Sequence, residues 1–253
     1  MNGCCPGRWP DVADPRRARL WGLVAERAGI QGVTVSAGHA CEVAAAVAGV
    51  DGGWLSMMSD PARRVLIHAT GQRAAELEEL QFTLGEGPCT DAFRSGSPVL
   101  VADLAARGWR EWWPGFTPAG VAAGAAALFA FPLVQGAIRV GVLGLYRATP
   151  GSLSPGALSD VLVCADVALL LLLNSRAGLD GGGDGFAEDG WSDDHARVYQ
   201  ATGMLSAQRG VGLEAALALL RAYAFSHDLT LDEVASAVVA RRLRLDSDGA
   251  GFP

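Results

Sequence analysis

The sequence predicts an α+β protein with two domains, on three observations. Two pairs of short apolar strands, each joined by turn residues, indicate a central antiparallel sheet. A long apolar helix follows them, and residues 197–245 have the spacing of three amphipathic helices. The length of 253 residues suits one large domain or two modest ones, and a hydrophobic fraction of 50% excludes a largely disordered chain.

The sheet is predicted from two hairpins. The expected strands are residues 52–59, 63–70, 128–134 and 138–147. Asp60-Pro61 and Gln135-Gly136 are typical turn residues between the paired strands. Around the sheet we expect a helix near residues 40–48, an irregular region from Ala75 to Trp113, and a helix that begins at Ser154-Pro155.

The last of these helices extends to about Arg176 and has an apolar seam with alternating steps of four and three residues. The seam consists of Leu158, Leu162, Ala165, Leu169 and Leu172. Such spacing directs one stripe toward a partner helix. Both a dimer interface and burial in the chain's own core fit this pattern.

Charge locates the domain boundary. Residues 1–176 hold 14 Arg and 15 acidic residues, whereas residues 177–196 hold six acidic residues, six Gly and no Arg. The second run is typical of a flexible linker. The predicted divisions are an N-terminal extension (1–38), a sheet domain (39–176), an acidic Gly-rich linker (177–191), a helical domain (192–245) and a tail (246–253).

Composition excludes several classes of protein. All 20 basic residues are Arg, a usage typical of a GC-rich genome, and the net charge of −7 argues against coating nucleic acid over the whole surface. Only residues 197–245 are basic, with six Arg against four acids. The sequence has no secretory signal and no uninterrupted apolar run of bilayer length, so we expect a cytoplasmic protein. Its five cysteines lack zinc-site spacing and are expected to be reduced.

The C-terminal helices have clear start and stop signals. Ser192 or Asp193 is expected to cap the first helix, and Gly210 and Gly212 to end it. The run from Thr230 to Glu233 is a capping box that opens the third helix. The apolar stripe of the second helix is Leu213, Leu217, Leu220 and Ala224.

The first of the three helices contains an unusual glycine. Its inward stripe is Val198, Ala201, Thr202 and Leu205, which leaves Gly203 on another face. A glycine in a helix interior costs about 1 kcal/mol relative to alanine. Either another backbone, such as a nucleic-acid strand, approaches this helix closely, or a neighbouring helix packs against it, and periodicity leaves both explanations open.

Three runs in this region resemble an ANTAR domain, the three-helix RNA-binding module of bacterial transcription antiterminators. The runs are residues 200–205 (QATGML), 214–224 (EAALALLRAYA) and 231–239 (LDEVASAVV). The chain departs from the family at Thr202, where many members have Lys. The resemblance implies RNA contacts, and the predicted RNA-binding residues are Arg197, Gln200, Ala201, Thr202, Gly203, Met204, Arg241 and Arg242.

The preceding two-thirds of the chain resembles a GAF domain. The matching residues are 80–89 (LQFTLGEGPC), Asp91-Ala92-Phe93, Pro98-Val99, Asp103-Leu104, 113–116 (WPGF) and 129–133 (FAFPL). The resemblance implies a PAS-like sensory fold: an antiparallel sheet with flanking helices, followed here by the small ANTAR bundle. We expect Trp54, Met57, Phe129 and Phe131 to line an apolar ligand pocket, with Arg139, Asp103 or Glu111 as polar contacts. A collapsed pocket in a domain kept for dimerisation is the alternative.

Together these features predict an RNA-binding antitermination regulator, gated by the GAF domain and acting as a homodimer on paired hairpins. No cofactor, metal or membrane partner is expected. A sensor that binds DNA through the same bundle is one alternative, and a thiol-dependent methionine sulfoxide reductase that uses Cys89 is another. His39, His68, His195 and His227 lack metal-site spacing, and the chain has no GxSxG motif or phosphate loop, so we expect no enzyme.

Overall fold

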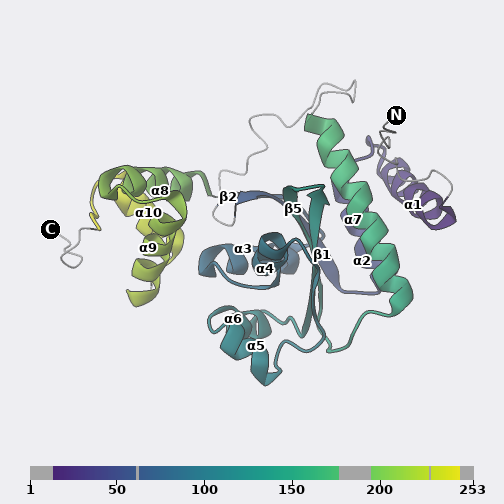
Figure 1. The fold of residues 1–253 in the computed structure, drawn as a ribbon, viewed down its shortest axis with the longest axis horizontal. Coiled ribbons are helices and arrows are strands. Elements are labelled where there is room, and N and C mark those ends of the chain that lie inside the picture. The colour runs from purple at the N-terminus through teal and green to yellow at the C-terminus, as the bar shows by residue number, and fades with distance from the viewer. Residues whose placement is uncertain (1–13, 61–62, 177–194, 228, 246–253) are drawn as a thin grey trace, which may run out of the picture.

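The computed structural model describes residues 14–60, 63–176, 195–227 and 229–245. Residues 14–60 and 63–176 form a sheet with helices on both faces (Figure 1). From here on we call this unit the sheet domain, and it includes residues 14–38, which the sequence had assigned to an N-terminal extension. Residues 195–245 form three helices to one side of it, here called the helical bundle (Figure 1). The predicted α+β class is therefore confirmed.

The sheet has five strands and is antiparallel throughout. The strands are β1 (Gly52–Asp60), β2 (Arg63–Ala69), β3 (Val99–Val101), β4 (Ala127–Gln135) and β5 (Ile138–Arg147). Their order is β2-β1-β5-β4-β3, so both predicted hairpins are present. Gly144 lies opposite Trp54, and a Cβ at this glycine would lie 2.3 Å from the indole ring. Only a residue without a Cβ therefore leaves room for the Trp54 ring at this position.

One face of the sheet is covered by α1 (Pro15–Gln31), α2 (Ala37–Ala48) and α7 (Pro155–Arg176). The predicted cap of α7 is present, because the Ser154 hydroxyl accepts the Ala157 amide at 3.1 Å. By length and composition alone, residues 155–175 of α7 are apolar enough to cross a membrane, with a mean hydropathy of 2.2. Here α7 packs on α2 and the sheet, and its Asp160 pairs with Arg16 and Arg19, as in a core helix.

The predicted dimer seam on α7 faces the chain's own core. Ala165, Leu169 and Leu172 are buried with α1, α2 and the sheet, and Leu158 is half-buried against the same cluster. Of the five seam residues only Leu162 is exposed, at 42%. Core burial therefore explains the four-three spacing, which fits a sheet-covering helix as well as a dimer seam.

The opposite face carries four helices, and the first three of them occupy the region of residues 75–113 that we had expected to be irregular. They are α3 (Gln72–Leu84), α4 (Pro88–Ser95), α5 (Arg107–Trp112) and α6 (Phe116–Ala122). The expectation for residues 75–113 was wrong because these helices are short and interrupted by glycines. Gly85 and Gly96 end α3 and α4 in the left-handed conformation, with φ of 72° and 69°.

The helical bundle consists of α8 (Ala196–Arg209), α9 (Leu213–Ser226) and α10 (Leu231–Val239). The capping box at α10 is confirmed: the Glu233 amide donates to the Thr230 hydroxyl at 3.2 Å, and the Glu233 carboxylate accepts the Thr230 amide at 2.8 Å. Gly210 ends α8, and Gly212 caps α9. The proposed caps Ser192 and Asp193, the linker and the tail lie outside the described residues.

The bundle lies beyond α3 and α4, on the side of the sheet opposite α7 (Figure 1). Phe82 of α3 is fully buried and belongs to the same apolar cluster as the bundle residues Leu217 and Leu220. One side chain of the sheet domain is thus part of the bundle's core.

Candidate nucleic-acid interface

Helix α8 presents a stripe with little side-chain bulk. Gln200, Gly203 and Ala207 are exposed at spacings of three and four residues, so they share one face of the helix. Outside the helix's own backbone, a Cβ built on Gly203 would find no atom within 4 Å. Packing against another helix of this chain therefore does not explain the glycine within the described residues.

Two predicted contact residues lie inside the bundle instead. Ala201 is fully buried and Thr202 is 4% exposed, and the Thr202 hydroxyl donates to the Val198 carbonyl at 2.7 Å. Neither side chain is available to RNA in this structure. The prediction that Ala201 and Thr202 contact RNA is therefore wrong for this structure, and their positions on the inward stripe of α8 had already indicated burial.

Met204 and Arg241, which are 37 positions apart in the sequence, line one hollow of about 400 Å³. The hollow also contains Gln208 and Arg244, which the sequence prediction missed. Two signals could have found them: Gln208 lies one turn after Met204, and Arg244 continues the basic run 241–244. The structure thus joins the C-terminal arginines to the face of α8 that carries Gly203.

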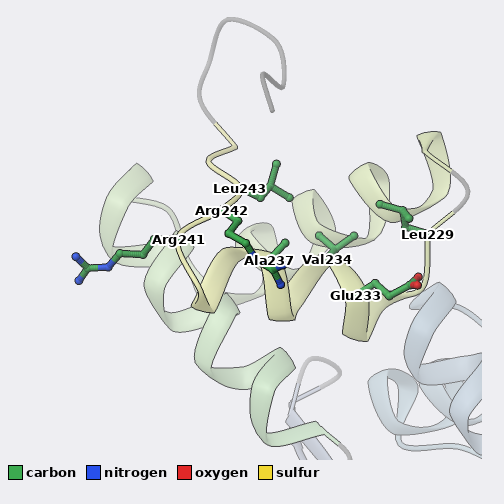
Figure 2. A pocket seen from close by; sticks show the side chains of 7 residues that line it. All are labelled: Leu229, Glu233, Val234, Ala237, Arg241, Arg242 and Leu243. Carbon is green, nitrogen blue, oxygen red and sulfur yellow. The ribbon is translucent and has the colours of Figure 1, made fainter. Parts of the chain in front are cut away.

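Arg241 and Arg242 leave α10 in different directions. Arg241 has a left-handed backbone, with φ of 57°, and the amides of Arg242 and Leu243 donate to the Ala237 carbonyl at 2.8 and 3.1 Å. In Figure 2 the Arg241 side chain extends away from Ala237, whereas Arg242 turns toward it. Arg242 thereby borders a second hollow, of about 530 Å³, next to Glu233.

The remaining predicted contact, Arg197, already has partners in the bundle. Its guanidinium donates to the Asp232 carboxylate at 3.2 Å and to the Ser236 hydroxyl at 3.4 Å. Both members of the ion pair are more than half exposed, so the pair contributes at most about 1 kcal/mol. Arg197 remains accessible, because both of these bonds come from Nη1 and leave its Nε and Nη2 donors free for a phosphate.

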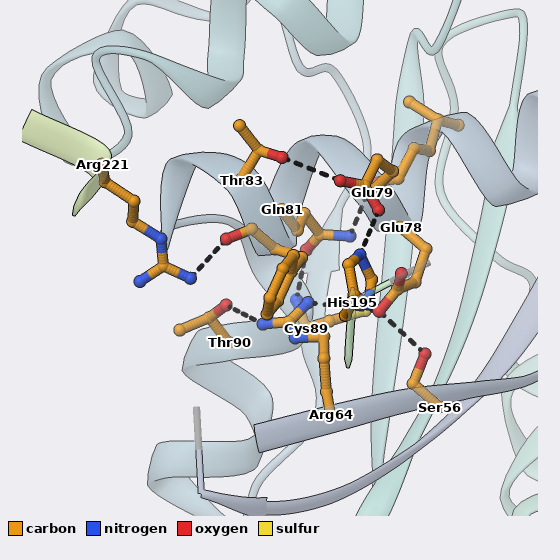
Figure 3. A network of polar contacts seen from close by, with 12 residues as sticks. Ser56, Arg64, Glu78, Glu79, Gln81, Thr83, Cys89, Thr90, His195 and Arg221 are labelled. Carbon is orange, nitrogen blue, oxygen red and sulfur yellow. Dashed lines mark hydrogen bonds and ion pairs between the residues drawn. The ribbon is translucent and has the colours of Figure 1, made fainter. Parts of the chain in front are cut away.

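The bundle is held against the sheet domain by what we call the docking interface, which the sequence did not reveal. It consists of Arg64, Glu79 and Phe82 from the sheet domain and His195, Tyr199 and Arg221 from the bundle. The Phe82 ring lies 3.9 Å from the His195 ring and 5.5 Å from the Arg221 guanidinium. Arg221 also donates a hydrogen bond to the Phe82 carbonyl (Figure 3).

Polar contacts in the docking interface continue into the core of the sheet domain. The Tyr199 hydroxyl donates to the Arg64 carbonyl and accepts the Arg64 amide at 3.0 Å. Because β2 is an edge strand, this hydroxyl pairs backbone groups of Arg64 that no neighbouring strand reaches. The Arg64 side chain, 1% exposed, reaches Glu78 at 3.5 Å and Thr90 at 2.9 Å (Figure 3). A buried ion pair therefore adjoins the strand that the bundle contacts.

His195 and Glu79 form the outer part of the docking interface, with 2.6 Å between Nε2 and Oε2. Burial alone would raise the pKa of Glu79. Hydrogen bonds from His195 and Thr83, with the charges of His195 and Arg64, outweigh burial and hold this pKa below its ordinary value. Burial lowers the pKa of Arg221 to about 10, so this guanidinium stays charged at neutral pH.

The motif in residues 80–91 has structural roles. Gln81 accepts the Cys89 amide at 2.8 Å at the start of α4, and Glu86 accepts the Gly115 and Phe116 amides at 2.6 and 2.8 Å at the start of α6. Asp91 accepts the indole N–H groups of Trp112 and Trp113. The motif therefore ties α3, α4, α5 and α6 together.

The predicted ligand pocket is not assembled. Trp54 is buried on the side of α3–α6, whereas Phe129 and Phe131 are buried on the side of α2 and α7, so they lie on opposite faces of the sheet. Met57 is half-buried. On the same side of the sheet as Trp54, the polar side chains of Arg64, Glu78, Gln81 and Thr90 are also buried. The proposed polar contacts, Arg139, Asp103 and Glu111, are all exposed.

The cysteines and histidines that the sequence raised as catalytic or metal-binding candidates have structural surroundings. Burial raises the pKa of the Cys89 thiol to about 12 and that of Cys164 to about 12, so neither is a thiolate at neutral pH. His39 belongs to the cap of α2, and the His227 ring stacks on Tyr223 at 3.9 Å. No group of three metal-ligating side chains occurs in the described part of the chain.

Two protein-family models match this chain: the GAF domain over residues 35–160 and the ANTAR domain over residues 192–239. The chain is a GAF and ANTAR domain protein. The GAF match covers the sheet and α2–α6, and the ANTAR match covers α8–α10. This pair of domains supports a regulator of the antitermination kind and points away from an enzyme.

Solved structures similar to this chain cover its GAF domain. One is a domain of a putative two-component sensor histidine kinase from Sinorhizobium meliloti (18% identity, 55% of this chain and 90% of that chain, TM-score 0.45). Others are the GAF domain of an Acinetobacter phosphoenolpyruvate-protein phosphotransferase (14%, 66% and 98%, 0.47) and a free methionine-R-sulfoxide reductase from Neisseria meningitidis (14%, 66% and 95%, 0.44). A comparison with curated proteins gives no match. At these scores the structural likenesses carry no argument about ligand or activity.

Proposed function

We propose that this protein is an RNA-binding transcription antitermination regulator. Its ANTAR domain binds paired hairpins in a nascent transcript and prevents a terminator from forming. The observation that carries the proposal is Gly203: a bare, exposed stretch of helix backbone that no packing within the described chain requires.

A glycine in a helix interior costs about 1 kcal/mol, so an open Gly203 lowers stability without improving packing. Close approach of a partner backbone accounts for it, because any larger side chain would project from the stripe of Gln200 and Ala207. Proteins recognise RNA mainly through loop bases splayed against the protein surface. A stripe with little side-chain bulk suits such a contact.

The arginines next to this stripe supply the electrostatic part of binding. Arg241, Arg242 and Arg244 are all exposed within four residues, and Arg241 and Arg244 border the hollow that contains Met204. Three phosphate contacts give a slope of roughly −2 in a plot of log affinity against log salt for single-stranded RNA. A local basic site of this size is compatible with an acidic protein.

We further propose that the protein is cytoplasmic and that it forms a homodimer. The dimer is proposed because paired hairpins call for two linked ANTAR domains. Leu162 and Leu170 are 42% and 40% exposed on the outer face of α7, and they replace the predicted seam as candidates for a two-fold contact. Replacing both with Glu tests this. A wild-type protein that sediments as a monomer at about 50 μM, well within the range of ordinary assays, would remove the dimer from the proposal.

The docking interface supports gating by the GAF domain. It leaves Gln200 and Gly203 exposed, so docking does not cover the proposed RNA face. Docking fixes the orientation of each ANTAR domain on its GAF domain through Phe82 and Tyr199. A signal in the GAF domain therefore acts on the relative placement of the two RNA-binding faces in a dimer.

The experiment that tests the proposal compares one pair of substitutions. First, RNA that crosslinks to the protein in cells is sequenced to identify a target. Binding of the wild type and of each variant to that RNA, and to DNA of the same sequence, is then measured at one salt concentration. Gly203→Leu should abolish RNA binding. Gly22→Leu is the matched control, because Gly22 also lies exposed in a helix interior with no atom within 4 Å of an added Cβ. Equal RNA binding by both variants would contradict the proposal, and a preference for DNA would favour the DNA-binding alternative.

A further inference from the structure

A hollow on the GAF domain gathers three of the seven tryptophans of the chain. It has a volume of about 550 Å³ and lies between α4 and α5, and we call it the tryptophan hollow. The rings of Trp109 and Trp113 stack at 5.0 Å with an angle of 8° between their planes. Trp112 is 69% exposed, although tryptophan is a residue that folding normally covers.

Asp91 places a negative charge against these rings. One oxygen of its carboxylate, Oδ2, accepts the indole N–H groups of both Trp112 and Trp113, at 2.7 and 3.0 Å. No Arg or His lies within ion-pair distance of Asp91 in the described part of the chain. The carboxylate therefore has two neutral donors and no cation, and its other oxygen makes no hydrogen bond within the same residues.

Arg94 also borders the hollow, and its charge is compensated elsewhere. Its guanidinium pairs at 3.0 Å with Glu214, in the first turn of ANTAR helix α9. The charge that faces the hollow without a counterion is therefore the negative one on Asp91. The same ion pair places the tryptophan hollow beside a contact between the two domains.

We propose that the tryptophan hollow binds an organic ammonium ion. Indole faces attract cations through the ring quadrupole, and tryptophan does so best among the aromatic residues. Trp113 is buried and stacked on Trp109, so the exposed indole is that of Trp112. An alkylated ammonium adds apolar surface that a hydrated metal ion lacks, so it can use both the Trp112 ring and the Asp91 carboxylate. The volume falls within the range of roughly 300–1,000 Å³ that small-molecule sites occupy.

The test uses choline and its neutral carbon isostere, 3,3-dimethylbutan-1-ol, with the full-length protein labelled with ¹⁵N at its tryptophan indoles. Choline should saturably shift the Trp112 and Trp113 indole signals, and the isostere should bind at least tenfold more weakly because it lacks the charge. Asp91→Asn, which keeps an oxygen acceptor for both indoles, should weaken choline binding at least tenfold while the isostere is unaffected.

Two further variants keep the test decisive if Asp91→Asn perturbs the fold. Trp112→Ala removes an exposed wall and should also weaken choline binding, whereas Trp21→Ala removes a 38% exposed tryptophan on α1 and should leave it unchanged. Equal binding of choline and the isostere, or equal choline binding by the wild type and Trp112→Ala, would overturn the proposal. The tryptophan hollow would then be a purely structural tie between α4 and α5.

Discussion

Replacing Phe82 with Ala should release the ANTAR domain from the GAF domain. The Phe82 side chain is fully buried and lies in the apolar cluster of the bundle, in contact with the His195 ring. Truncating a buried Phe to Ala costs about 3–5 kcal/mol, which corresponds to two or more orders of magnitude in an equilibrium constant. Most of this cost falls on docking, because Phe82 packs mainly against bundle residues.

The other contacts between the two domains are polar and individually smaller. The two hydrogen bonds between Tyr199 and the Arg64 backbone contribute about 1 kcal/mol each, and the exposed pair of Arg94 and Glu214, outside the docking interface, contributes less. The His195–Glu79 contact and the Arg221 hydrogen bond to the carbonyl of residue 82 do not involve the Phe82 ring. The docked state should therefore give way to one in which the two domains move independently.

Small-angle scattering and calorimetry measure this change. Phe82→Ala should increase the radius of gyration and split one melting transition into two, and Phe225→Ala is the control, because Phe225 is 85% exposed on α9. Affinity for a single hairpin should stay the same, and affinity for a two-hairpin RNA should fall, since the linked sites lose their fixed orientation. An unchanged radius of gyration and a single transition in Phe82→Ala would refute the role given to docking.

Three more outcomes follow from the structure. Arg241→Ala and Arg241→Gly should both weaken RNA binding, and both should reduce the slope of log affinity against log salt by about 0.7, because each removes one phosphate contact. The Arg241→Gly protein should be more stable than the Arg241→Ala protein, because residue 241 has a φ of 57° that glycine adopts without strain. Docking should weaken as pH falls through the lowered pKa of Glu79, because the carboxylate that His195 and Thr83 stabilise is then protonated, and Glu79→Gln should remove this dependence in scattering measurements. Cys89 should resist thiol reagents at pH 7 in native protein and react once the protein is unfolded, as thiol titration would show.

The local order of the fold could be predicted from the sequence. The β1–β2 and β4–β5 pairings were predicted from the apolar runs on either side of Asp60-Pro61 and Gln135-Gly136. The Thr230–Glu233 capping box marks a helix start that the structure confirms. These features depend on neighbouring residues alone. The helices of residues 72–112 were missed because their glycines, which cap α3 and α4, look like loop residues in a sequence.

Which face a strand residue occupies depends on pairing register, and the sequence did not supply it. Trp54 pairs with Gly144, whereas Phe129 pairs with the next residue, Leu145. A shift of one residue places side chains on opposite faces of a sheet, so the expected pocket could not form. The docking interface was equally hidden, because it joins residues from α3 and α8 that are more than 100 positions apart.

Part of the RNA face was predictable and part was not. Periodicity placed Gly203 outward and Thr202 inward, and both positions are as it indicated. The resemblance to the ANTAR family added Thr202 to the contact residues, and burial removes it. That Arg241 and Arg244 lie beside Met204 depends on how α10 packs against α8, which no spacing rule specifies.

The α8 face around Gly203 and the C-terminal arginines should contact RNA. The most direct measurement is ultraviolet crosslinking of the full-length protein to its recovered RNA, followed by mass spectrometry of the crosslinked peptides. We predict crosslinks within residues 197–209 and 237–244, and their loss in Gly203→Leu. Crosslinks concentrated on the GAF domain, or crosslinks in the ANTAR domain that persist in Gly203→Leu, would show that RNA binds elsewhere.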